Sequence, residues 1–253
     1  PRASLTRATF EQSARAASSS SGQRQTGLAA IFVIFLLTLM LAGQSVSMLA
    51  EEKSNKVIEI LAAAVPLEAV FLGKLTGLFG VALLFVGFWG GLAALALSAI
   101  PGGGAIAGAL QPAIGLGPFA VLCVIYFAMG YLLLGAVFLG VGAQAGSMRE
   151  IQMLSLPITL FQMAMFGLAS AAAGAGPGSM VATVGEVFPF SSPFAMAAKA
   201  ANDPALWPHL LAIAWQGLWV SLTIAFSARW FRRGVLKSGG RRGLFRRSAA
   251  AAD

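Results

Sequence analysis

The sequence is poor in the side chains that carry most enzyme chemistry. Among 253 residues there are one cysteine, one histidine and nine acidic side chains. Charged residues make up 10% of the chain, against about 25% in an average soluble domain. The single cysteine, Cys123, excludes an intrachain disulfide, and one cysteine with one histidine excludes a zinc site built from these ligands. No GxxxxGK(S/T) run occurs, so ATP binding by that type of loop is excluded as well.

Apolar residues are abundant instead. They make up 58% of the chain, and the mean hydropathy is +0.81, which is typical of an integral membrane protein. A spanning helix needs roughly 20 apolar residues, and five uncharged segments have about this length or more. They are residues 28–49, 75–100, 119–141, 151–172 and 210–228. The sequence therefore predicts an all-α integral membrane protein with a transmembrane domain over residues 28–228.

Few polar side chains lie within these spans. None of them is acidic, so a carboxylate proton relay across the membrane is not expected. Tyr126 needs a partner for its hydroxyl. Ser45, Ser47 and Gln162 are expected to hydrogen-bond between helices, with a place on a transport path as the alternative.

A charged stretch separates the first two spans. Val57, Ile58, Leu61 and Val65 recur at helical spacing, while the other side of the stretch carries Glu52, Lys53, Asn55, Lys56 and Glu59. This pattern predicts an amphipathic helix over residues 51–65 that lies in the membrane interface.

Residues 1–27 and 173–208 flank or interrupt the spans. The first segment is read as a flexible segment or the end of a missing upstream domain. The second is the longest loop, with short helices expected at Val181–Val187 and Phe194–Ala201. Between them, Pro189, Ser191, Ser192 and Pro193 predict a turn. This turn is either an interfacial anchor or a re-entrant element that lines an exit path.

One histidine and two acidic side chains lie in or beside this loop. His209 is expected at the surface, because it has no second histidine to join it. Glu186 and Asp203 have no visible partner in the sequence. A membrane enzyme that uses the outer loop would depend on these two carboxylates.

The basic residues predict an orientation. The densest cluster follows the fifth span and comprises Arg229, Arg232, Arg233, Lys237, Arg241, Arg242, Arg246 and Arg247. By the positive-inside rule, this tail, residues 229–253, is cytoplasmic. The stretch 51–65 then faces the cytoplasm and the 173–208 loop faces out. A juxtamembrane basic cluster suits anionic lipid, so the net charge of +8 does not indicate a nucleic-acid partner.

Three motifs carry a family resemblance. The run from Glu51 to Leu61, followed by Pro66 and Gly73-Lys74-Leu75, resembles the permeases of type-2 ABC exporters, most of all the sodium-efflux (NatB-like) group. The turn from Pro189 to Phe194 and the segment Arg229–Leu236 are similar to two further motifs of that family.

The resemblance implies a working unit of two permeases and two ATPase subunits. It places ATP and magnesium in the partner ATPase, with no cofactor in this chain, and a multi-pass protein in the bacterial inner (plasma) membrane. Upstream it implies a first membrane helix and an extracytoplasmic domain that ends within residues 1–27. Residues 51–61 become the coupling helix that docks on the ATPase. The contacts expected there are Glu51, Glu52, Lys53, Asn55, Lys56 and Glu59.

The leading hypothesis is therefore an exporter permease, not an enzyme itself, for sodium, a drug or a lipid. Peptides also remain open. No acidic residue lies in a span, so the sequence offers no carboxylate ligand for a sodium path across the membrane. The alternatives are the outer-loop membrane enzyme and a structural scaffold that transports nothing. For residues 51–65, the alternative to a coupling helix is an inert interfacial anchor.

Overall fold

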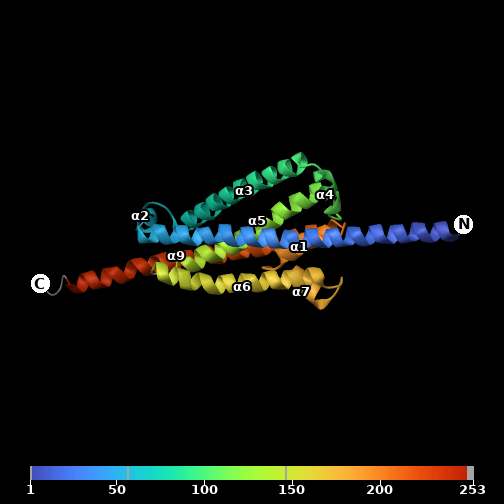
Figure 1. Ribbon diagram of the computed structural model, residues 1–253. Coiled ribbons are helices and arrows are strands. Elements are labelled where there is room, and N and C mark those ends of the chain that lie inside the picture. The colour runs from blue at the N-terminus through green and yellow to red at the C-terminus, as the bar shows by residue number, and fades with distance from the viewer. Residues whose placement is uncertain (1, 56, 146, 250–253) are drawn as a thin grey trace. The chain divides into compact units, whose positions relative to one another are not determined.

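The computed structural model describes residues 2–55, 57–145 and 147–249 (Figure 1). Within these ranges every regular element is a helix, which confirms the all-α prediction. The helices are α1 (Arg2–Ser54), α2 (Val57–Ala64), α3 (Leu67–Ala99), α4 (Gly103–Ala109), α5 (Leu116–Gly142), α6 (Met148–Gly174), α7 (Met180–Val187), α8 (Ser192–Asn202) and α9 (Trp207–Ala249).

Five of these helices are long and apolar enough to cross a membrane. The candidate spans are Ser20–Leu49, Leu67–Ala99, Leu116–Gly142, Arg149–Gly174 and Trp207–Val235. Each coincides with one of the five segments predicted from hydropathy. Most of the helices extend beyond the predicted segments, because polar residues at their ends keep helical hydrogen bonding after the apolar run stops.

Two segments differ from their sequence-based description. Residues 2–27 are helical and continue without a break into the first span as part of α1. The charged stretch 51–65 is divided in two, because Glu51–Ser54 finish α1 and Val57 starts α2. Asn55 lies in the turn between them, a position that suits its side chain. Lys56 lies outside the described residues.

Other helices begin close to proline, glycine or serine residues, which favour turns. The Pro66 carbonyl accepts hydrogen bonds from the amides of Ala69 and Val70, at 3.0 and 3.2 Å, and α3 therefore starts directly after this proline. Helix α4 lies within the Gly/Pro-rich loop and follows Gly102, whose φ of 84° favours glycine. Helices α7 and α8 confirm the two short helices predicted in the long loop.

The chain divides into two compact units, and all five long helices contribute to both. The first unit contains residues up to Phe35, Leu84–Phe127 and Met165–Gln216. The second contains Leu36–Leu83, Ala128–Ala164 and the residues from Gly217 onward.

Helix α8 forms the centre of the first unit. Nearly all of its residues are buried, and most of them are alanine. Small side chains let neighbouring helices approach closely. At Gly27 of α1, for example, a Cβ would lie 3.2 Å from the Ala198 carbonyl oxygen. The ring of Phe194 also meets Phe35 of α1, at 6.1 Å between centroids.

The second unit has an apolar core of a different kind. Large side chains from α1, α3, α5 and α9 pack together, and the rings of Phe71 and Phe231 lie 5.5 Å apart. The buried members of this core are Leu49, Leu67, Phe71, Leu75, Ala136, Leu139, Ala143, Ala228, Phe231 and Val235. This core fixes the helix ends that carry the charged stretch.

Candidate functional site

The first candidate site is the charged stretch between α1 and α3. Glu52 at the end of α1 forms an ion pair with Lys74 of α3. Only 21% of the Glu52 side chain and 10% of the Lys74 side chain are exposed. Glu52 was predicted to contact an ATPase, but its carboxylate is engaged within the chain. Lys74, from the Gly73-Lys74-Leu75 motif, is held by the same pair.

A second ion pair lies in the same unit. Arg232 of α9 donates to Glu68 of α3 at 2.9 Å, and both side chains are well exposed. The rings of Phe71 and Phe231, each close in sequence to one partner of this pair, pack against each other. Helix α3 is therefore joined to α1 by one ion pair and to α9 by another.

The Arg229–Leu236 segment has further contacts that sequence reasoning did not anticipate. The Gln144 side-chain amide, in the turn after α5, donates to the Trp230 carbonyl at 2.7 Å. At Gly234, a Cβ would lie 2.6 Å from the Ala143 carbonyl oxygen. This part of the motif is therefore needed for packing of α9 against the end of α5.

The other predicted coupling residues lie around α2. Glu51 and Asn55 are exposed, while the side chains of Lys53 and Glu59 lie outside the description, as does Lys56. Apolar side chains of α2 and the turn after it are also exposed, namely Val57, Ile60, Leu61 and Val65. An exposed helix of this composition suits either lipid or a protein partner.

The second candidate site is the turn between α7 and α8. The Ser191 hydroxyl donates to the Gly185 carbonyl at 2.9 Å, and the Gln216 amide donates to the Ser192 hydroxyl at 2.8 Å. The Trp215 indole donates to the Val187 carbonyl at 2.8 Å. Both serines are fully buried. The predicted turn residues therefore tie the α7–α8 segment to α9.

The two prolines have local roles in the same turn. Pro193 occupies the first turn of α8, where its missing N–H costs nothing, and Pro189 is buried. Gln216 was not predicted from the sequence. The signal available was an amide side chain next to an indole within an otherwise apolar span.

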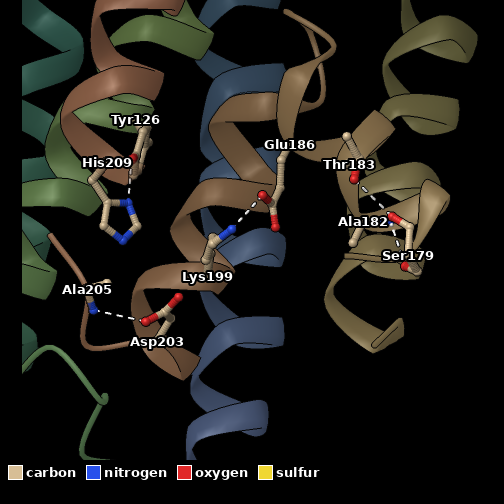
Figure 2. A network of polar contacts seen from close by, with 9 residues as sticks. All are labelled: Tyr126, Ser179, Ala182, Thr183, Glu186, Lys199, Asp203, Ala205 and His209. Carbon is tan, nitrogen blue, oxygen red and sulfur yellow. Dashed lines mark hydrogen bonds and ion pairs between the residues drawn. The ribbon is translucent and has the colours of Figure 1, made fainter. Parts of the chain in front are cut away.

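The acidic residues of the long loop have partners (Figure 2). Lys199 of α8 donates to Glu186 of α7 at 2.6 Å, and each side chain is 27% exposed. Asp203 accepts the Ala205 amide at 2.9 Å, just after α8. The expectation that these carboxylates lack partners is therefore wrong. It rested on residues that are neighbours in the sequence, whereas Lys199 comes close to Glu186 only through the α7–α8 turn.

The prediction that His209 lies at the surface is also wrong. Its side chain is 1% exposed, and its Nδ1 lies 2.7 Å from the Tyr126 hydroxyl of α5 (Figure 2). The position at the entry of a span suggested contact with water, but the helical register directs the ring toward α5. This contact confirms that the Tyr126 hydroxyl has a partner.

The second unit also contains a pocket of about 210 Å³ between α1, α5 and α6. Its polar side chains are uncharged, namely Ser47, Gln152, Ser155 and Thr159, and Leu39, Val46, Phe138 and Ile151 supply apolar walls. Gln162 on α6 is buried, and its Oε1 has no partner in the part of the chain that the structure describes. Over the same part, no three His, Cys, Asp or Glu side chains gather as a metal site.

Comparison with known proteins gives a consistent result. Residues 4–229 match the profile of a family described as ABC-2 family transporter protein. The uncharacterized protein MJ1024 of Methanocaldococcus jannaschii is 26% identical over 207 residues, which are 81% of this chain and 48% of the relative. The uncharacterized protein YhaP of Bacillus subtilis is 28% identical over 218 residues, 83% of this chain and 51% of the relative. The chain thus spans about half the length of these relatives. No solved structure matches it.

Proposed function

Because the chain belongs to the ABC-2 family of transporter proteins, we propose that it is the transmembrane permease subunit of an exporter driven by a separate ATPase. The observation that carries this proposal is the family match over residues 4–229 in a chain with five candidate spans. The working unit is two permease halves, identical or homologous, with two ATPase subunits. The chain itself would hold no nucleotide.

The charged stretch is the proposed docking site. The exposed Glu51, Asn55 and apolar side chains of α2 would contact the ATPase, and Lys53, Lys56 and Glu59 would join them. Glu52 has a different role in this proposal, because it already pairs with Lys74. It would pass movement of the docking site to α3, and the Glu68–Arg232 pair would pass it on to α9.

The proposed orientation follows from charge. The basic end of α9 and the docking site face the cytoplasm, in a bacterial inner membrane, and the α7–α8 segment faces outward. The contacts of Trp215 and Gln216 to the α7–α8 turn support a re-entrant element that moves together with α9.

The substrate class is proposed from the pocket of the second unit. Its lining combines hydroxyl and amide groups with aliphatic and aromatic walls and has no charged side chain. Such a lining favours a drug-like or lipid-like molecule over a bare sodium ion, which prefers carboxylate or several carbonyl ligands. The outer-loop enzyme is disfavoured, since the family that the chain matches is described as a transporter family.

The test is co-purification of an ATP-binding subunit with the full-length protein in detergent. Charge reversal of the exposed Glu51 to lysine, together with Leu61→Glu in α2, should release the ATPase. Glu150→Gln, on the exposed start of α6, is the matched control and should retain it. If no ATPase is recovered with the unchanged protein, or if the double variant retains it fully, the docking proposal is wrong.

A further inference from the structure

A larger pocket lies in the first unit, between the end of α6, α7 and α8. Its volume is about 480 Å³, within the range of about 300–1,000 Å³ typical of small-molecule sites. Part of its lining is small and aliphatic, namely Ala172, Ala173, Ala175, Pro177, Ala182, Ala195 and Pro204. The polar lining residues are Thr183, Glu186, Lys199, Asn202 and Asp203.

The charged groups of this pocket retain capacity for a ligand. Lys199 has three N–H donors, and its hydrogen bond to Glu186 uses one of them. Asp203 uses Oδ1 to accept the Ala205 amide, and its Oδ2 accepts no hydrogen bond from the described residues. Figure 2 shows Glu186 and Lys199 facing each other, with Asp203 at the end of the same helix as Lys199.

Arg24 of α1 adds a second cation at the rim. Its Nη2 lies 3.5 Å from the place where a Cβ of Gly174 would stand, and Gly174 is between the lining residues Ala173 and Ala175. Arg24 is exposed and has no ion-pair partner among the described residues. The pocket and its rim therefore present two carboxylates and two cations.

We propose that this pocket binds a zwitterion that carries a primary ammonium group and an acidic group, such as a phosphate. The carboxylates of Glu186 and Asp203 hold the ammonium, and the side chains of Lys199 and Arg24 hold the acidic group. Glu186 and Lys199 neutralise each other, so the charges left for a ligand are one carboxylate, Asp203, and one cation, Arg24. A ligand with both signs of charge matches both groups, whereas a simple cation or anion would leave one of them unmatched. The aliphatic wall accepts the uncharged part of the ligand.

The lining also distinguishes between kinds of ammonium group. Quaternary ammonium groups are recognised by aromatic faces, and the pocket lining has no aromatic side chain. A primary ammonium donates hydrogen bonds that carboxylates accept. The same chemistry is found in free phosphoethanolamine and in a phosphatidylethanolamine headgroup. The proposal concerns binding at the first unit and does not depend on transport or on an ATPase.

The test uses the full-length protein in nanodiscs of phosphatidylcholine, whose headgroup has a quaternary ammonium. Phosphoethanolamine is titrated by calorimetry, with phosphocholine as the matched probe of equal charge. Saturable binding of phosphoethanolamine that is at least about tenfold tighter than that of phosphocholine supports the proposal. Nanodiscs of phosphatidylethanolamine then show whether the ligand is the free molecule or the lipid headgroup. Loss of phosphoethanolamine binding in these nanodiscs shows that the lipid headgroup occupies the pocket.

Variants locate the binding. Asp203→Asn keeps an oxygen for the Ala205 amide and removes one carboxylate, and Arg24→Gln removes the rim cation. Each should weaken binding by about tenfold or more, as expected for one lost charge-assisted hydrogen bond. Glu150→Gln, outside the pocket, should bind as the unchanged protein does. The proposal is overturned if neither soluble probe binds saturably in either kind of nanodisc. It is also overturned if the two pocket variants bind phosphoethanolamine like the control.

Discussion

The amide of Gln216 donates a hydrogen bond of 2.8 Å to the hydroxyl of Ser192, and both side chains are fully buried. One turn of the long loop is thereby fixed to the N-terminal part of α9. The neighbouring Trp215 makes a second contact, to the Val187 carbonyl. These two contacts hold the α7–α8 segment against α9, so the segment and the helix are expected to unfold together.

Replacing Ser192 by alanine should lower the free energy of unfolding by about 1–3 kcal/mol, because the buried Gln216 amide then lacks its acceptor. The measurement is thermal unfolding in detergent. Ser221→Ala is the control, since Ser221 is exposed on α9 and donates only to its own helix. Equal melting temperatures for the two variants would show that the buried contact contributes little.

The Glu52–Lys74 pair should matter more than the exposed Glu68–Arg232 pair. Glu52→Gln leaves a lysine that is 10% exposed without its carboxylate, which should cost about 1–3 kcal/mol. Glu68→Gln should cost less than about 1 kcal/mol, since its pair is exposed to water.

Both variants can be compared by thermal unfolding at low and high salt. The exposed pair should lose its contribution as salt rises, and the shielded pair should retain most of it. If the Glu52→Gln variant were as stable as Glu68→Gln, the result would contradict the role of the Glu52–Lys74 pair as a stabilising contact between α1 and α3.

Tyr126 and His209 form a contact that a double-mutant cycle can measure. Tyr126→Phe and His209→Leu each remove one partner of the 2.7 Å contact. If the pair is coupled, the double variant should be more stable than the sum of the single effects predicts, by about 0.5–3 kcal/mol. Strict additivity of the unfolding free energies would show that the two side chains are only neighbours.

The spans could be predicted from the sequence because hydropathy is a property of each segment by itself. The short helices of the long loop were predictable for a similar reason, since proline and serine mark their ends. The buried position of His209 and the Glu186–Lys199 pair were not, because both depend on contacts between residues distant in the sequence. Residues 2–27 were ambiguous, as an Ala- and Ser-rich polar segment is compatible with helix or coil.

Gly234, in the segment Arg229–Leu236, also shows what the sequence can and cannot predict. A glycine run or pair can be read from the sequence, but not which glycine touches a neighbour. At Gly217 of α9 a Cβ would meet nothing within 4 Å, while at Gly234 of the same helix it would lie 2.6 Å from the Ala143 carbonyl oxygen. Only the packing of α9 against the end of α5 distinguishes them.

The two glycines therefore give a matched pair of variants. Gly234→Ala should destabilise the protein by about 1–3 kcal/mol, because backbone must move to admit the methyl group. Gly217→Ala should be neutral or stabilising by up to about 1 kcal/mol, since alanine is the better helix former and the site is open. Thermal unfolding of both variants in one detergent checks this. If Gly234→Ala is as stable as Gly217→Ala, then α9 does not pack on the end of α5 as described.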